Sequence, residues 1–235
     1  MNLTGKFFGN NEKRLVKYSV VDYNRYFENN VLDTIPLELL PLGQLTLPTG
    51  QVIACDPFVC IHDSLPFNRT VEPGNYPVIA SIAKTEQSGN RYAVVKVDFN
   101  HARPTKWELA VLNDNVIADL KEEDAFVGYP VDGGLGCFCD LETQKYFNEF
   151  LDDAYNKDPK SDIYTDFFAA EFKRNAVEQD NPDDPGDWVN FHLPNKPGLN
   201  IIMFHSGYGD GIYPCYWGTN DKGDICCLVV DFCVI

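Results

Sequence analysis

The stretch "CFCDLETQKYFNEFLDDAYN", residues 137–156, contains the point at which the apolar residues change period. Before Asp140, apolar residues occur in short runs that are typical of strands. After Asp140 they follow a helical period, which places on one face Phe147, Phe150, Leu151 and Ala154. Asp is also a preferred N-cap residue. The sequence therefore predicts a helix over residues 141–156 that begins after Asp140.

A second helix is predicted over residues 162–177, where Tyr164, Phe168 and Phe172 recur at four-residue spacing. The acidic, proline-rich stretch "EQDNPDDPGD", residues 178–187, follows it. This stretch lacks the pattern of acidic residues and glycine that a calcium-binding EF-hand loop requires. We therefore predict a solvated loop.

Segments with strand character lie on both sides of the two helices. N-terminal to them, "QLTLPTGQVIACDP" (44–57) alternates around a Pro-Thr-Gly turn, which predicts a hairpin. The next three segments predict an antiparallel meander. They are "GNYPVIASIAK" (74–84), "NRYAVVKVDFN" (90–100) and "KWELAVLN" (106–113).

C-terminal to the helices, "WVNFHL" (188–193) and "LNIIMFHS" (199–206) predict two more strands. The glycine-rich stretch "SGYGDGIYPCYWG" (206–218) predicts a bent hairpin with Asp210 at its exposed tip. The apolar run "DICCLVVDFCVI" (224–235) is typical of a buried central strand, which "TNDKGD" (219–224) joins to the preceding one through a hairpin turn.

Strands, then two helices, then strands predict an α+β protein. We expect a largely antiparallel β-sheet with two main helices inserted between strand groups. The chain contains no clear linker, so a single domain over residues 1–235 is expected. Within it, residues 1–42 are a poorly defined N-terminal segment, because two prolines interrupt the pattern in "TIPLELLPL" (34–42).

The chain is strongly acidic, with 19 basic and 35 acidic residues and a net charge of −16. This charge argues against nucleic acids and anionic membranes as partners, because both would repel it. It suits a basic protein partner or a small polar ligand. There is no signal-peptide pattern at the N-terminus and no apolar run long enough to cross a membrane, so a cytoplasmic location is expected.

Eight cysteines occur in the chain, most of them inside apolar runs. We expect reduced, mostly buried thiols, since free cysteine behaves as a small apolar residue. A zinc site is a weaker alternative, because the sequence has one C-x-C pair and no second tight pair. Its conceivable ligands are Cys137, Cys139, Cys215 and His205. No cofactor is predicted.

Four aspartates lie in turns that the sequence marks with glycine, proline or a helix start: Asp56, Asp132, Asp140 and Asp210. The ordinary interpretation is turn and cap chemistry, and Asp140 fits it best as an N-cap. The functional interpretation is that several of these carboxylates converge at one end of the sheet. There they would bind a cation or raise one another's pKa.

Aromatic residues accompany two of these aspartates. We expect Asp132 and Asp210 to share a cleft, which Tyr208, Tyr213 and Trp217 would wall for a ligand. Tyr216 and Trp188 are further candidates, and some of these rings are expected to be core residues instead. Ser206 does not fit a nucleophile elbow, and "DGGLGCFCD" (132–140) lacks the lysine of a phosphate-binding loop.

Two functions remain open at this point. The first is a non-enzymatic binding or interaction module with an acidic cleft flanked by aromatic residues, of which a toxin-neutralising protein is one example. The alternative is a metal-assisted hydrolase built on Asp132, Asp140 and Asp210.

Six blocks of sequence, in order from Gly43 to Phe232, resemble a mainly bacterial family known as domain of unknown function 4241. The blocks are "GQLTLPTGQVIACDP", "VEPGNYPV", "WELAVL", "YPVDGGLGCFCD", "SGYGDGIYPCYWG" and "CLVVDF". The resemblance implies that these blocks belong to one fold. It implies no activity, cofactor or catalytic residue.

Overall fold

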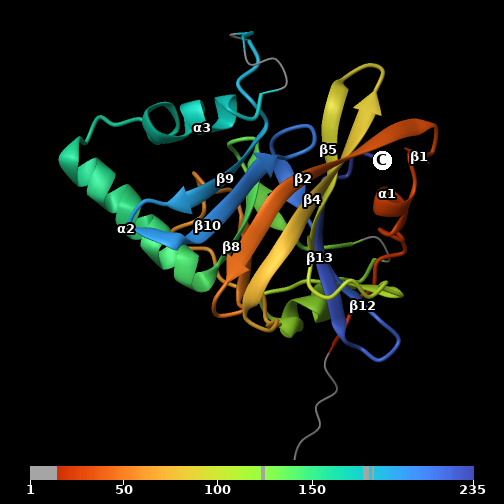
Figure 1. Cartoon of the computed structure of the whole chain (residues 1–235). Helices are drawn as coiled ribbons and strands as arrows, with labels where there is room; N and C mark the ends of the chain where they lie inside the picture. The colour runs from red at the N-terminus through yellow and green to blue at the C-terminus, as the bar shows by residue number, and fades with distance from the viewer. Residues whose placement is uncertain (1–14, 123–124, 177–179, 182) are drawn as a thin grey trace, which may run out of the picture.

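The computed structural model describes residues 15–122, 125–176, 180–181 and 183–235. Most of its regular structure is antiparallel strand, with few helices (Figure 1). The prediction of an α+β protein is therefore confirmed. The strands form a seven-stranded sheet, a four-stranded sheet and a two-stranded ribbon.

The large sheet has the order β1-β2-β4-β5-β13-β12-β6, and all its pairs are antiparallel. Its strands are β1 (Val31–Leu32), β2 (Ile35–Leu47), β4 (Gly74–Thr85), β5 (Gly89–Asp98), β13 (Ile225–Asp231), β12 (Cys215–Thr219) and β6 (Lys106–Leu109). The C-terminal run lies between β5 and β12 and is buried along most of its length, so the predicted central strand is confirmed.

The small sheet has the order β3-β8-β10-β9 and is also antiparallel. Its strands are β3 (Val52–Cys55), β8 (Leu135–Asp140), β10 (Lys196–His205) and β9 (Trp188–Leu193). The ribbon pairs β7 (Tyr129–Val131) with β11 (Gly211–Tyr213).

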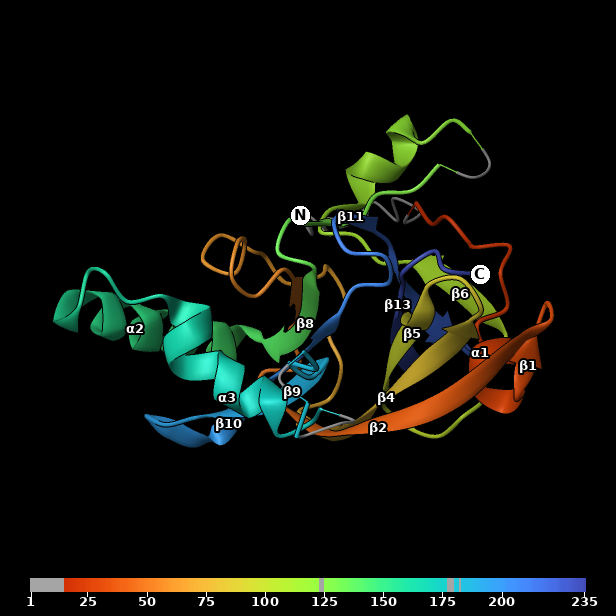
Figure 2. The same ribbon diagram turned by 90° about the horizontal axis from the view of Figure 1, so that it is seen from above.

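Helix α2 (Leu141–Lys157) confirms the first predicted helix. The second is a π-helical turn η2 (Tyr164–Phe168) continued by α3 (Ala169–Lys173), and its predicted end at Val177 lies outside the described residues. Both cover the face of the small sheet that points away from the large sheet (Figure 2). Two short helices complete the list: α1 (Arg25–Glu28) and η1 (Asp114–Asp119).

Three predicted connections are wrong. The stretch 44–57 is no hairpin, because β2 joins the large sheet and β3 the small one. The meander ends at β5, since β6 pairs with β12. The stretch 206–218 is also no hairpin: it leads from β10 through β11 to β12, and these strands lie in three different sheets. Alternation of apolar and polar residues indicates that one face of a strand is buried, but it does not indicate which sheet the strand joins.

Strand β2 continues across Pro36 and Pro41, which the sequence pattern treated as interruptions. The register with β4 shifts between Pro41 and Gly43, and Gly43 has a φ of 105°. A bulge is a position where a strand tolerates proline, and a positive φ favours glycine. The two residues together explain why the strand is not broken.

The space between the two sheets forms one apolar core. It contains Phe138 and Phe204 from the small sheet and Trp217, Val95 and Leu228 from the large sheet, all fully buried. A second cluster lies between the small sheet and its helices, and a third on the outer face of the large sheet. Among the described residues, no helix has the length and apolar character needed to cross a membrane.

All eight cysteines are free thiols, and six of them are buried. Cys60 is half-buried and Cys233 is exposed. The prediction of mostly buried thiols is confirmed.

The start of α2 is fixed by Asp140, which is fully buried. Its carboxylate accepts a hydrogen bond from the Glu142 N–H at 2.8 Å, as an N-cap does, and others from the Thr49 N–H at 3.1 Å and hydroxyl at 2.8 Å. Burial raises the pKa of this carboxyl, against the lowering effect of these bonds. Asp140 therefore joins the helix start to the crossover between the sheets.

We expect Asp140→Ala to lower the free energy of unfolding by about 1–3 kcal/mol, because it leaves buried donors without an acceptor. Denaturant unfolding monitored by circular dichroism measures this. Asp152→Ala, an exposed position on the same helix, is the control and should change stability by less than about 0.5 kcal/mol. Equal effects of the two substitutions would contradict the assigned role of Asp140.

Candidate functional site

The β7–β11 ribbon places Asp132 and Asp210 at one end. Val131 pairs with Gly211 in the antiparallel register, so Asp132 and Asp210 are the next residues on the two strands. Both are exposed. Sequence reasoning expected these carboxylates to lie together, and the register places them as neighbours at the end of the ribbon.

Asp56 holds the turn that contains Asp132. Its side chain is fully buried and accepts hydrogen bonds from four backbone N–H groups. Two come from Phe58 and Val59 at 3.0 and 3.2 Å, and two from Asp132 and Gly133 at 3.1 and 2.7 Å. Asp56 therefore has a structural role, and its carboxylate is occupied.

Asp140 does not join Asp132 and Asp210. It ends strand β8, whereas Asp132 precedes the beginning of that strand, so the length of β8 separates them. Within the described ranges, no group of three or more His, Cys, Asp or Glu side chains is arranged to hold a metal ion. The hydrolase prediction thus has no three-carboxylate site there, and the conceivable zinc ligands form no such group either.

The three aromatic residues that were predicted to line the cleft differ in their exposure to solvent. Tyr208 is exposed, and the Arg91 guanidinium lies 5.7 Å from its ring centroid. Tyr213 is buried, and its hydroxyl donates to the carbonyls of Gly209 and Ser206. Trp217 is fully buried between the two sheets. Of the three, only Tyr208 is open to solvent.

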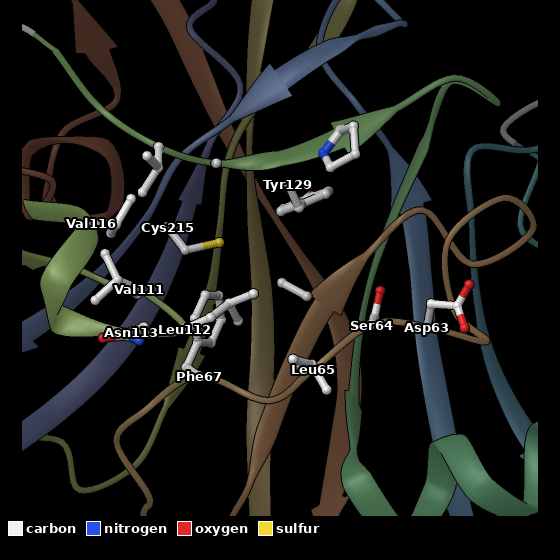
Figure 3. Close-up of a pocket in the computed structure, with 15 residues that line it drawn as sticks. Asp63, Ser64, Leu65, Phe67, Val111, Leu112, Asn113, Val116, Tyr129 and Cys215 are labelled. Atoms are coloured by element: carbon white, nitrogen blue, oxygen red, sulfur yellow. The ribbon is translucent and has the colours of Figure 1, made fainter. Parts of the chain in front are cut away.

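A cavity of about 440 Å³ lies beneath β7, which contributes Tyr129 and Pro130 to its lining (Figure 3). Most of its lining is apolar and includes Ala54, Phe67, Ala110, Val111, Val116 and Val127. The Cys215 sulfur and the Tyr129 ring face the same space as Phe67 and Leu65. Pockets of this size and composition bind small molecules or single side chains.

Two polar groups lie at the inner side of this cavity. Burial raises the pKa of the Tyr129 hydroxyl well above its usual range, and the same is true of the Cys215 thiol. The Tyr129 hydroxyl has no hydrogen-bond partner among the described residues. It packs closely against Gly136, where an added Cβ would lie 2.5 Å from the hydroxyl oxygen. Only glycine at position 136 leaves room for the tyrosine.

The mouth of the cavity is flanked by exposed leucines. Leu65 is 63% exposed and Leu112 is 54% exposed. The loops that carry them are held together, since Asn68 donates its backbone N–H to the Val111 carbonyl at 3.0 Å. Asp63 also lines the cavity and is exposed. The mouth therefore combines apolar side chains with a carboxylate.

Sequence reasoning missed this cavity. Its lining comes from four segments that are distant in the chain, at residues 54–67, 110–116, 127–130 and 215. The one local feature of the sequence is the Tyr-Pro pair at 129–130, since proline is tolerated at the beginning of a strand. The side chains meet only where β3 of the small sheet, β7 of the ribbon and β12 of the large sheet come together.

Comparison with known families places this arrangement in context. The model of a family described as "Protein of unknown function (DUF4241)" matches residues 45–230, most of the chain. The chain belongs to this family. The matched region of this DUF4241 protein contains the whole lining of the cavity, together with Asp132 and Asp210. Searches of curated proteins and of solved structures found no match.

Tyr129 and Tyr213 form a directly paired position of the ribbon and provide a matched test. Tyr129→Phe removes a buried hydroxyl without a partner, so the free energy of unfolding should stay the same or rise by about 1 kcal/mol. Tyr213→Phe removes a donor that is bonded at 2.8 Å to Gly209 and should lower it by about 1 kcal/mol. Thermal and denaturant unfolding of both variants measure the difference. A loss in Tyr129→Phe as large as in Tyr213→Phe would contradict the assignment.

Proposed function

We propose that this DUF4241 protein is a non-enzymatic binding module that receives an apolar group of a basic partner in the cavity beneath β7. The observation that carries the proposal is the pair of exposed leucines at the mouth of an apolar cavity. Apolar side chains that are exposed beside a concave site are typical of a binding surface.

The chemistry of the lining supports an apolar occupant. Phe67, Val111 and Val116 offer side chains without hydrogen-bonding groups, and the inner hydroxyl of Tyr129 is closely packed against the backbone. A group that brings its own charge into this space would lose its hydration without an ion partner. An aliphatic or aromatic side chain, or the apolar part of a small ligand, fits better.

Charge supports a basic partner. The described lining carries the carboxylate of Asp63 and no Lys or Arg, and the whole chain has a net charge of −16. The exposed Asp132 and Asp210 lie at the end of the ribbon whose strand β7 covers the cavity. A positive partner would be steered towards this surface. A basic protein, such as a toxin that the module neutralises, is the partner class we favour over a small polar ligand.

The test uses three acetylated tripeptide amides and the isotope-labelled full chain. We expect Lys-Phe-Lys to bind about tenfold more tightly than Lys-Gly-Lys, because burial of the ring contributes, and than Glu-Phe-Glu, because like charges repel. Chemical-shift titration gives the affinities, and the shifted resonances should include Ala110, Val111 and Val127. Equal affinity for all three peptides, or shifts elsewhere only, would overturn the proposal.

A pair of leucine substitutions locates the site independently. Leu112→Ser removes apolar surface at the mouth and should weaken Lys-Phe-Lys binding by about fivefold. Leu39→Ser changes a leucine that is 45% exposed on β2, away from the cavity, and should leave the affinity unchanged. If both variants bind like the parent chain, the leucines do not form the binding surface.

A further inference from the structure

A second cavity lies on the outer face of the large sheet, beside β6, β12 and β13. Its volume is about 190 Å³, below the range of about 300–1,000 Å³ that is typical of drug-sized ligands. Aromatic side chains line it, and they are Tyr18, Tyr23, Phe126 and Tyr216. The carboxylate of Asp231 lines it as well. This set of side chains resembles the composition of sites that bind organic cations.

The cavity does not overlap with the apolar cavity beneath β7. Leu109, Pro214 and Tyr216 line the second cavity, whereas Ala110 and Cys215 line the first. Successive residues of a strand point to opposite faces, so the two cavities lie on opposite faces of the sheet near its β6 edge. Binding to the second cavity is thus independent of the function proposed for the first.

Asp231 supplies a buried carboxylate that has no cationic partner among the residues the structure describes. It is 8% exposed, and its carboxylate accepts hydrogen bonds from the Tyr23 hydroxyl and from the Cys233 N–H, each at 2.8 Å. Among the described residues, both hydrogen-bond donors to this carboxylate are neutral. Burial raises the pKa of Asp231, because the ionised form loses hydration that these two bonds replace only in part. A cation in the cavity would restore that compensation.

The rings around the carboxylate are held in place. Tyr23 and Tyr216 stack with their centroids 5.2 Å apart, and Trp107 meets Tyr23 edge-on at 5.2 Å. The Ser19 N–H donates to the Trp107 carbonyl and the Leu109 N–H to the Lys17 carbonyl, which fixes the segment that carries Tyr18 beside β6. Two rings are thus buried, while those of Tyr18 and Phe126 remain partly exposed at the opening.

Lys17 also lines this cavity, so its position matters. Its ammonium group donates to the Glu122 carbonyl at 2.6 Å and forms no ion pair with Asp231. A bound cation would be repelled by Lys17 and attracted by Asp231. Asp231 should therefore strengthen the binding of a cation and Lys17 should weaken it, and substitution of each residue tests its effect separately.

We propose that this cavity is a binding site for an organic ammonium group, held by the Asp231 carboxylate and the surrounding tyrosine rings. The group arrives either on a free small amine or as a lysine side chain of a protein. Two of the four aromatic residues, Tyr18 and Tyr23, and the carboxylate of Asp231 come from residues outside 45–230, the region that the family model matches.

The experiment titrates the full chain with choline and with 3,3-dimethylbutan-1-ol, an uncharged molecule of the same shape. We expect saturable choline binding with shifts at Tyr18, Ala125 and Tyr216, and about tenfold weaker binding of the alcohol. Equal binding of both molecules, or no binding of choline, would overturn the proposal. A second arm compares choline with N-acetyl-lysine methylamide, and the tighter of the two identifies the source of the ammonium group.

Three substitutions separate the contributions. Asp231→Asn should weaken choline binding about tenfold, and Lys17→Met should strengthen it severalfold. If Asp231→Asn does not fold, Tyr18→Leu at an exposed position tests the cage, with Tyr155→Leu on α2 as its control. Tyr18→Leu should weaken choline binding and Tyr155→Leu should not. Unchanged affinity in Tyr18→Leu and Lys17→Met would overturn the assignment, while Leu112→Ser should leave choline binding as it is.

Discussion

The buried carboxylates of Asp56 and Asp140 lie at the two ends of the β3–β8 pair, and the position of the small sheet depends on their hydrogen bonds. Asp56 follows the end of β3 and accepts the N–H groups of the turn before β8. Asp140 ends β8 and accepts the N–H and hydroxyl of Thr49, just before β3. Each carboxylate thus binds the segment that leads into the opposite strand. The crossover from the large sheet and the start of α2 are fixed by the same contacts.

This arrangement explains why such costly groups are buried. A carboxylate that leaves water loses several kcal/mol of hydration, and it is tolerated inside a protein only when donors replace the water. Asp56 has four backbone donors, and Asp140 has three donor groups. Apart from the Thr49 hydroxyl, these donors are backbone N–H groups of turns and of a helix start, which themselves need acceptors. The carboxylates thus supply acceptors for these donors, and the donors replace the water that the carboxylates lose.

Features of the fold that depend on local interactions could be predicted from the sequence, whereas those that depend on contacts between distant segments could not. Helix α2 and its cap are local, so the change of apolar period at Asp140 was sufficient to place them. The pairing of β2, β6 and β11 depends on contacts between distant segments, and the same alternating pattern suits several partners. Most strands could therefore be identified from the sequence, but β1 and β7 were not, and three strands were joined to the wrong neighbours. Proline at a bulge hid the beginning of β2 for the same reason, since the bulge forms only against β4.

The roles of the four aspartates in the site also depend on contacts between distant segments. In the sequence Asp140 stood out as an N-cap, whereas Asp56, Asp132 and Asp210 looked equivalent because each lies at a turn. Burial divides them into two structural residues at the ends of β3 and β8 and two exposed residues at the end of the ribbon.

The two structural carboxylates also determine where the exposed ones lie. By binding the backbone of Asp132 and Gly133, Asp56 fixes the turn that joins β7, which contributes to the lining of the apolar cavity, to β8 of the small sheet. The cavity and the acidic end of the ribbon are therefore connected through one hydrogen-bonded turn. A partner that contacted both parts would meet a turn whose backbone is already held by Asp56, so less free energy of association would be lost to ordering that turn.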